Sequence, residues 1–490
     1  CKTSGQWLAA LDLMSQAGAR RLRCDAVTYN ATMTVCKSAE QWVASLALLQ
    51  EMEREAVAPS VVSYSAAIGA CLRGSRWAAV SGLMEAMRQA AVAANVVIHG
   101  AAVSVCEKRH QWEKAVQVLG DMHRTRMECS VIAYNAGISA CEKGKRWALA
   151  MCLVDQMVLT KLQPDIITYN ASISAFEKGH QWALALAALR RLQRTGLVPN
   201  MTTYNATISA AEKGQQWRVA LNMLRGMQKS ALAPGVITCS AAISACEKGF
   251  RWTAALTILE RMSLQRLEPN SITYNATISA CEKGGQWQAA TILLQQLLEA
   301  QLEPSAVSFN ATISACEKGY EWEAAVNVFQ CMNRQGVKPS VVSYNALISA
   351  CEKGGQWMLA MDLVELLQHK ELRPSAVTYN AAISACEKGE QWQAALGMMV
   401  AMRSGALRPQ VISYNAAILA CASGTQWKVA LGLHDEMLAG ALEPDANGYS
   451  RLLMECEQHG LVSREVTLLS GVGAALGPAG ASAASRVAAS

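Results

Sequence analysis

The chain has 490 residues, of which 52% are hydrophobic and 17% are charged, and its formal net charge is +6. No uninterrupted apolar run reaches the ~18 residues that a membrane-spanning helix needs, so no membrane insertion is expected and the apolar residues are interpreted as core. The mild positive charge permits a polyanionic partner without requiring one. Length alone would suggest about three domains, but a regular repeat overrides that prior.

All 13 tryptophans, from Trp7 to Trp427, lie 35 residues apart. A fixed period of this length indicates a repeat array, in which each unit buries its apolar face against its neighbours. We predict twelve complete 35-residue repeats over residues 26–445. Residues 1–25 are the back part of a preceding repeat, and residues 446–469 are the front part of a following one.

The two ends of the chain differ from the complete repeats. Cys1 occupies the cysteine position of the repeat, so the sequence is expected to start inside a repeat, and any targeting segment would lie upstream. Residues 470–490 are rich in Gly, Ala and Ser and are expected to form a flexible tail.

The first half of each repeat predicts one helix. A Ser or Thr such as Thr273 can cap the start of this helix, because its side-chain oxygen accepts an unpaired backbone N–H. Tyr274, Ile278 and Cys281 follow at helical spacing and form one apolar face. Gly284 is predicted to end the helix, because glycine tolerates the left-handed conformation at a helix C-terminus.

The second half of each repeat predicts another helix. This helix starts near Trp287, continues its apolar stripe through Ala290, Leu294 and Leu297, and stops before Pro304. Strand-type alternation is absent. The sequence therefore predicts an all-α fold, an α-solenoid superhelix of about 13 stacked helix–turn–helix repeats. The aligned tryptophans are interpreted as a packing spine, with an exposed stacking surface as the alternative.

Catalytic and metal-binding patterns are missing from the sequence. Most of the 17 cysteines share one repeat position and none forms a Cys-x-x-Cys pair, so we predict buried thiols in a reducing compartment and no metal site. The zinc deaminase signature, the P-loop and the nucleophile elbow are also absent. The chain is therefore not expected to be an enzyme or to carry a cofactor.

The fifth residue of most repeats is an asparagine, which is a poor residue inside a helix because its amide competes for backbone hydrogen bonds. We predict that these amides serve recognition on the inner face, with a first-turn helix cap as the alternative. The asparagines are Asn30, Asn135, Asn170, Asn205, Asn275, Asn310, Asn345, Asn380 and Asn415. The other complete repeats carry Ser65, Gly100 and Ser240 at this position.

The last residue of each repeat is small or polar and varies, which favours a readout position over a weakly constrained loop residue. These residues are Ser60, Asn95, Ser130, Asp165, Asn200, Gly235, Asn270, Ser305, Ser340, Ser375, Gln410 and Asp445. A lysine before the helix-ending glycine forms a third recurrent position, at Lys143, Lys178, Lys213, Lys248, Lys283, Lys318, Lys353 and Lys388. Such a line of cations could follow a phosphate backbone, although adjacent glutamates offset it and helix-dipole pairing is the alternative.

The period and the core Tyr-Asn-Ala-x-Ile-Ser-Ala-Cys-x-Lys-Gly resemble the pentatricopeptide repeat family, of the pure 35-residue type, over residues 1–469. The resemblance implies single-stranded RNA binding, one base per repeat, with the fifth and last residues together choosing the base and the lysine approaching a phosphate. It also implies that the apolar second residue of the repeat sandwiches the base. That residue is Val27, Val62, Ile132, Ile167, Ile272, Val307, Val342, Val377 or Ile412.

Carried over to this chain, the family's base code implies the target 5′-CAnUYYACCCyU-3′. Four pairs of Asn with Ser imply cytosine: Asn30–Ser60, Asn275–Ser305, Asn310–Ser340 and Asn345–Ser375. Two pairs of Ser with Asn imply adenine: Ser65–Asn95 and Ser240–Asn270. Two pairs of Asn with Asp imply uracil: Asn135–Asp165 and Asn415–Asp445. Three pairs imply a pyrimidine, the last of them weakly: Asn170–Asn200, Asn205–Gly235 and Asn380–Gln410. Gly100 with Ser130 departs from the code, so a gap in recognition is expected there.

The resemblance implies a role in organellar RNA processing, stabilisation or translation, in a mitochondrion or chloroplast, with protein processing factors as further partners. The alternative function is a protein-binding scaffold, as in the related 34-residue helical repeats. An enzyme whose catalytic domain lies outside this sequence is the third possibility.

Overall fold

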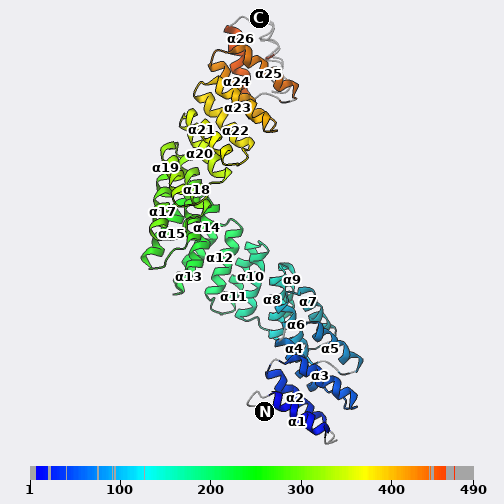
Figure 1. Cartoon of the computed structure of the whole chain (residues 1–490). Helices are drawn as coiled ribbons and strands as arrows, with labels where there is room; N and C mark the ends of the chain where they lie inside the picture. The colour runs from blue at the N-terminus through cyan, green and yellow to red at the C-terminus, as the bar shows by residue number, and fades with distance from the viewer. Residues whose placement is uncertain are drawn as a thin grey trace, which may run out of the picture. The chain divides into compact units, whose positions relative to one another are not determined.

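The computed structural model describes residues 7–19, 24–39, 41–73, 77–90, 92, 95–125, 127–440, 442, 446–458 and 468. Within these residues every regular element is an α-helix of 13 residues, and no strand occurs (Figure 1). The first helices of the repeats are α2 (Ala26–Ser38), α4 (Val61–Arg73), α6 (Val96–Lys108), α8 (Val131–Lys143), α10 (Ile166–Lys178), α12 (Met201–Lys213), α14 (Val236–Lys248), α16 (Ser271–Lys283), α18 (Ala306–Lys318), α20 (Val341–Lys353), α22 (Ala376–Lys388), α24 (Val411–Ser423) and α26 (Ala446–Gln458). The second helices are α1 (Trp7–Ala19), α3 (Trp42–Arg54), α5 (Trp77–Gln89), α7 (Trp112–Arg124), α9 (Trp147–Leu159), α11 (Trp182–Arg194), α13 (Trp217–Lys229), α15 (Trp252–Leu264), α17 (Trp287–Glu299), α19 (Trp322–Arg334), α21 (Trp357–His369), α23 (Trp392–Ser404) and α25 (Trp427–Ala439).

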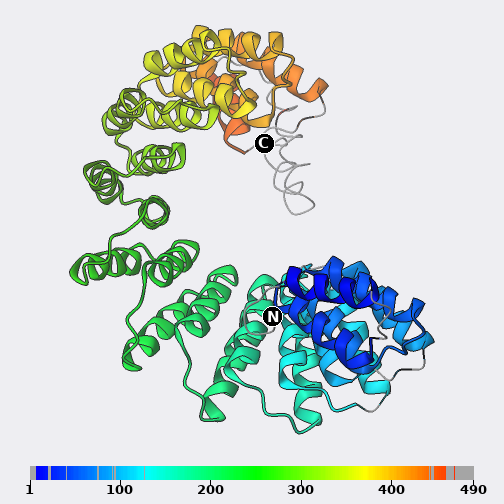
Figure 2. The ribbon, with the colours of Figure 1, turned by 60° about the horizontal axis from the view of Figure 1, so that its bottom comes forward.

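The chain divides into two units, residues 1–245 and residues 246–490. Inside each unit the first helix of a repeat packs against the first helix of the next, as α10 does against α12 and α20 against α22 (Figures 1 and 2). Most second helices pack against the first helix of their own repeat and that of the following one, as α11 does against α10 and α12, and α21 against α20 and α22. The prediction of an all-α α-solenoid of stacked helix–turn–helix repeats is confirmed. Residues 470–490, the predicted tail, lie outside the described residues.

The predicted apolar faces form the core. Tyr274, Ile278 and Cys281 of α16 are buried, and so are Ala290 and Leu294 of α17. Burial raises the pKa of the Cys281 thiol to about 11. At neutral pH such thiols stay protonated and unreactive, as expected for cysteines that fill helix interfaces.

The first helices begin two residues earlier than predicted. The helix α16 starts at Ser271, and its N-cap is Asn270, whose Oδ1 accepts the Thr273 N–H at 2.9 Å. The predicted cap, Thr273, is therefore the third residue of the helix. The last residue of one repeat thus caps the first helix of the next, and Ser, Asn and Asp are favoured there for a structural reason. The weakly constrained loop residue, the alternative interpretation, does not fit this role.

The helix-ending glycine stands where predicted, but for a different reason. Gly284 caps the C-terminus of α16 with an ordinary φ of −87°, and the left-handed residue is the next one, Gly285, with φ 66°. In another repeat that next residue is Lys145 with φ 56°, so the left-handed conformation does not require glycine. The expected role of Gly284 in adopting that conformation was wrong.

The glycine is instead required by close packing against tryptophan. A Cβ added to Gly354 would lie 2.7 Å from Cγ of Trp322 in the preceding repeat, well inside van der Waals contact. The same contact joins Trp112 to Gly144, Trp147 to Gly179, Trp182 to Gly214, Trp252 to Gly284, Trp287 to Gly319, Trp357 to Gly389 and Trp392 to Gly424. The tryptophans therefore link consecutive repeats, which supports the packing-spine interpretation.

Candidate nucleic-acid interface

One face of each first helix carries the residues that the sequence singles out. In α20 the second, fifth, ninth and twelfth residues are Val342, Asn345, Ser349 and Glu352, and helical spacing places them on one side. The fourth and eighth residues, Tyr344 and Ile348, lie on another side of the helix and are buried. Because first helices pack on first helices, the polar face repeats along each unit.

The second residue of the first helices is apolar and exposed. Val342 keeps 61% of its surface exposed. Large hydrophobic side chains at this position are exposed in other repeats too: Val27, Val62, Val97, Ile132, Ile167, Ile237, Ile272, Val307, Val377 and Ile412. A row of exposed aliphatic side chains at a fixed interval is a surface suited to flat apolar partners.

The fifth residue forms a closed set of hydrogen bonds with the next repeat, which we call the amide ring. Its members in one repeat are Asn345, the last residue Ser375 and the third residue of the next helix, Thr378. The Ser375 N–H donates to Thr378 Oγ1 at 3.0 Å, and the Thr378 hydroxyl donates to Asn345 Oδ1 at 2.6 Å. The Asn345 Nδ2 donates to Ser375 Oγ at 3.3 Å.

The donor and acceptor roles in the amide ring fix the orientation of the amide. The Thr378 hydroxyl accepts the Ser375 N–H, and its single proton faces two oxygens, Asn345 Oδ1 at 2.6 Å and Ser375 Oγ at 3.0 Å. Because an amide oxygen carries no proton, the Thr378 hydroxyl is the donor in the shorter contact, and the Asn345 Nδ2 faces Ser375. One N–H of the amide remains for another partner.

The amide ring recurs along the array. A third-residue hydroxyl donates to the Asn Oδ1 at 2.5 to 2.6 Å in eight repeats, from Ser63 to Asn30, Thr168 to Asn135, Thr203 to Asn170, Thr238 to Asn205, Ser308 to Asn275, Ser343 to Asn310, Thr378 to Asn345 and Ser413 to Asn380. The Asn amide also donates to the last residue at 3.1 to 3.5 Å in five pairs: Asn30–Ser60, Asn135–Asp165, Asn170–Asn200, Asn275–Ser305 and Asn345–Ser375. The structure thus brings the fifth and last residues together. The first-turn cap proposed as an alternative for the asparagines is wrong, because the last residue is the cap.

In three repeats one or both partners of the bond between the hydroxyl and the amide are missing. The repeats with Ser65 and Gly100 are followed by Ile98 and Ala133, which carry no hydroxyl. The repeat with Asn415 is followed by Gly448. Asn415 is only 7% exposed, and its Oδ1 has no hydrogen-bond partner. Its predicted partner Asp445 lies outside the described residues.

Asp165 is the charged member of one amide ring. Burial acts to raise the pKa of this carboxyl, but hydrogen bonds from the Thr168 N–H and hydroxyl and from the Asn135 amide outweigh it and hold the pKa below its ordinary value. The carboxylate is therefore stabilised in its charged form, as an acceptor for the Asn135 amide.

The recurrent lysines form an ion-pair ladder between repeats. Lys353 Nζ lies 3.0 Å from Glu317 of the preceding repeat, and Ser349 donates to the same carboxylate at 3.0 Å. The other ladder pairs are Lys143–Glu107, Lys178–Glu142, Lys213–Glu177, Lys283–Glu247, Lys318–Glu282 and Lys388–Glu352. Lys248 holds the same position at the end of α14. The cations are thus paired across repeats, and the lysine side chains stay 28 to 43% exposed.

Two parts of this face were missed by the sequence interpretation. The third-residue hydroxyls were assigned to capping alone, although they occur after each Asn except Asn415. A further local feature is Thr202, which replaces the aliphatic second residue and accepts the Asn170 Nδ2 at 3.0 Å. That repeat therefore has no exposed aliphatic side chain at its second position.

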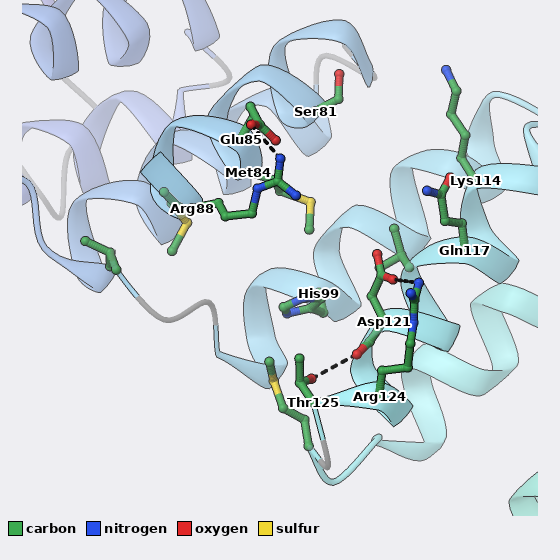
Figure 3. A pocket seen from close by; sticks show the side chains of 14 residues that line it. Ser81, Met84, Glu85, Arg88, His99, Lys114, Gln117, Asp121, Arg124 and Thr125 are labelled. Carbon is green, nitrogen blue, oxygen red and sulfur yellow. Dashed lines mark hydrogen bonds and ion pairs between the residues drawn. The ribbon is translucent and has the colours of Figure 1, made fainter. Parts of the chain in front are cut away.

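A separate cavity of about 1150 Å³ lies between the second helices α5 and α7 (Figure 3). Its charged groups are largely matched, because Arg88 pairs with Glu85, and Arg124 pairs with Asp121. His99, which replaces the usual tyrosine, lines the cavity from α6. Across the described part of the chain, no cluster of metal-ligating side chains occurs and no helix has the length and apolarity to cross a bilayer.

Comparisons with known proteins identify the repeats. The family model described as "Pentatricopeptide repeat domain" matches residues 12–73, 117–179, 152–213, 187–249, 222–284, 257–319 and 327–391, and the model "PPR repeat" matches residues 307–337. A comparison with curated proteins found no match.

Solved structures with similarity to the chain include three pentatricopeptide repeat structures. The protein PPR10 from maize is 18% identical with a TM-score of 0.46, over 96% of this chain and 76% of that one. PPR10 in complex with an 18-nt psaJ RNA element is 20% identical with a TM-score of 0.35, over 93% of this chain and 80% of that one. The PPR domain of Arabidopsis thaliana protein-only RNase P 1 in complex with tRNA is 12% identical with a TM-score of 0.34, over 37% of this chain and 95% of that one. Because the repeat models match well over half of the sequence, the chain belongs to the pentatricopeptide repeat family.

Proposed function

We propose that the chain binds single-stranded RNA sequence-selectively, with one base per repeat and the RNA running 5′ to 3′ from the N-terminal to the C-terminal repeat. The observation that carries this proposal is the amide ring, which joins the fifth residue to the variable last residue in five repeats at multiples of the 35-residue period. A periodic polar pair of this kind matches a ligand that is itself periodic and presents one hydrogen-bonding edge per unit.

The chemistry of the face supports RNA over a protein partner. The exposed aliphatic second residues, such as Val307 and Val342, supply apolar contacts for flat bases on either side. The amide of Asn345 keeps one N–H for a base edge, and the identity of the last residue changes the donors and acceptors beside it. Base-edge hydrogen bonds of this kind discriminate by about 1–3 kcal/mol.

The ion-pair ladder supports a modest contribution from phosphate contacts. Lys353 uses one of its three ammonium donors on Glu317, and its remaining donors are available to a phosphate. The nearby glutamate lowers the local positive potential, so we propose that base contacts contribute more to selectivity than charge does. The weak net charge of +6 agrees with this balance.

Membership of the family supports a role in organellar RNA processing, stabilisation or translation, in a mitochondrion or chloroplast. A bound array would hold the RNA unfolded, block exonucleases or recruit processing factors. The proposed target is 5′-CAnUYYACCCyU-3′, in which the uracil at the fourth base is assigned to Asn135 and Asp165.

A titration at fixed salt tests the proposal. We expect the target RNA to bind at least about tenfold more tightly than a scrambled RNA of the same composition, which corresponds to ~1.4 kcal/mol. The double substitution Asn135→Ala with Asp165→Ala is expected to relax selectivity at the fourth base only, by ~1–3 kcal/mol. Equal affinity of the unaltered chain for both RNAs would contradict the proposal.

A further inference from the structure

The hydroxyl at the third residue of a first helix is the buried member of the amide ring. Thr378 is fully buried, yet it bonds the half-exposed Asn345 of the preceding repeat at 2.6 Å. The equivalent hydroxyls that bond an asparagine in the other seven repeats are buried as well: Ser63, Thr168, Thr203, Thr238, Ser308, Ser343 and Ser413. A buried hydroxyl that serves capping alone would not need an asparagine partner in the repeat before it.

The array itself links this hydroxyl to the asparagine. In two of the three complete repeats without asparagine, those with Ser65 and Gly100, the next third residue is Ile98 or Ala133, whereas Ser240 is followed by Thr273. Where the asparagine is retained without a hydroxyl, at Asn415, the amide oxygen is left buried and without a hydrogen-bond partner. An unpaired buried polar atom is costly, so the hydroxyl and the amide belong together physically.

The hydroxyl decides which end of the amide faces the last residue. An asparagine amide has a donor end and an acceptor end of nearly equal shape, so a 180° rotation exchanges them. In the ring, Thr378 accepts the Ser375 N–H, and its single proton faces two oxygens, Asn345 Oδ1 at 2.6 Å and Ser375 Oγ at 3.0 Å. The rotated amide would lose this short bond to its oxygen, and the Thr378 proton would have to turn to the more distant Ser375 Oγ.

We infer that the third-residue hydroxyl of each following repeat is a positioning residue that sets base specificity, because it orients the Asn amide at the interface. The inference rests on the proposed RNA-binding function. It means that the specificity of one site depends on two residues beyond the asparagine: the last residue of the same repeat and the third residue of the next one. A site without the hydroxyl retains its asparagine but presents either end of the amide to the base.

The loss experiment removes the hydroxyl from one ring. Thr378→Val keeps the side-chain shape, and Thr378→Ser keeps the hydroxyl. Each variant is titrated at fixed salt with four RNAs that differ only at the tenth base of the target. We expect the unaltered chain and Thr378→Ser to prefer cytosine by about tenfold, and Thr378→Val to fall to about twofold or less, within the span that one hydrogen-bonded base contact supplies.

The matched control is Thr312→Val. Thr312 is also fully buried in a first helix, and its hydroxyl donates to the carbonyl of Ser308 in the same helix at 2.9 Å. It is the seventh residue of α18 and not the third, so it is no member of an amide ring. This control also loses a buried hydroxyl, and we expect it to keep the cytosine preference at the ninth base.

The gain experiment builds a ring where none exists. Gly100 has open space around an added Cβ, and Ser130 already caps the next helix at the Ala133 N–H. Gly100→Asn alone supplies the amide without the hydroxyl, and Gly100→Asn with Ala133→Thr supplies both. We expect the double variant to gain a cytosine preference of about tenfold at the third base, and the single variant to gain about twofold or less.

The outcomes separate the two proposals. If the unaltered chain shows no base preference at the tenth position, the proposed function fails. If it prefers cytosine and Thr378→Val prefers it equally, the positioning role is overturned while RNA recognition stands. If circular dichroism shows that Thr378→Val does not fold, the two variants of the gain experiment provide the test. Equal cytosine preferences of the single and the double variant at the third base would then overturn the positioning role.

Discussion

At the scale of single residues, two glycines differ in what surrounds them. Gly354 ends α20 and lies against Trp322, whereas Gly397 lies in the exposed middle of α23 with open space around it. The first glycine is required because a methyl group would enter the indole. The second has no such constraint and only weakens its helix.

Alanine at these two positions is expected to have opposite effects. Gly354→Ala should lower the free energy of unfolding by ~1–3 kcal/mol, because overpacking forces the tryptophan or the helix end to move. Gly397→Ala should raise it by ~0.5–1 kcal/mol through better helix propensity. Urea unfolding followed by circular dichroism measures both. A neutral Gly354→Ala would show that the tryptophan contact is not tight.

Asp165 predicts a pH dependence of stability. Its folded pKa lies below the ordinary value of 3.8, so the charged carboxylate stabilises the fold above about pH 4. This contribution is lost as the pH falls through the folded pKa. Asp165→Asn keeps a capping side chain, as Asn200 does in the next repeat. We expect the stability difference between the two proteins to shrink from pH 6 to pH 3, and a difference that stays constant would contradict the ionic role.

At the scale of the helix, the first helices combine three functions on three sets of residues. Residues such as Tyr344 and Ile348 form the core, Glu317 and Lys353 connect neighbouring helices, and Val342 and Asn345 remain for a ligand. The ladder pairs are partly exposed, so each contributes little to stability, about 0–1 kcal/mol. Their larger effect falls on the electrostatic potential of the interface.

Neutralising a ladder glutamate is expected to strengthen RNA binding. Glu317→Gln removes the carboxylate that pairs with the Lys353 ammonium. We therefore expect the affinity for the target RNA at low salt to rise roughly two- to fivefold. The control is Glu323→Gln on the second helix α19, which changes the net charge equally but lies off the interface face. Anisotropy titrations at two salt concentrations measure both variants. If Glu323→Gln raises affinity as much, the effect reflects net charge and the lysines have no special role.

The sequence predicts the helices of each repeat well, but not every residue that begins or ends them. The period and the Tyr, Ile and Cys spacing predict two helices per repeat because burial on one face follows helical periodicity. The helix start was placed at Thr273 instead of Ser271, because a Ser or Thr at the third position resembles a cap and the true cap, Asn270, stands in the preceding repeat. The glycine was misinterpreted because its partner, a tryptophan 32 residues earlier, is a contact between repeats that no local rule contains.

The candidate site shows the same limit. The fifth and last residues stand out because each recurs or varies at one position of a regular array. The hydroxyl of Thr378 does not stand out, because Ser and Thr at a helix start have an ordinary explanation in capping. Only the geometry shows that it also bonds Asn345 of the preceding repeat.

At the scale of the whole molecule, the central property is that equivalent sites recur at a fixed interval. Each site is assembled from one repeat and the start of the next, so a change at one last residue should affect one base and leave the others unchanged. Ser305 is suited to test this, because it caps α18 and contacts Asn275 at 3.3 Å. Aspartate at this position keeps the capping function and reproduces the Asn135–Asp165 arrangement.

The most direct measurement is therefore the base preference of Ser305→Asp. The variant and the unaltered chain are titrated with RNAs that carry each of the four bases at the eighth position, and with a second series that varies the ninth base as a control. We expect the preferred eighth base to change from cytosine to uracil, by ~1–3 kcal/mol, while the preferred ninth base stays cytosine. An unchanged preference for cytosine at the eighth base, in a variant that folds and binds, would contradict the account.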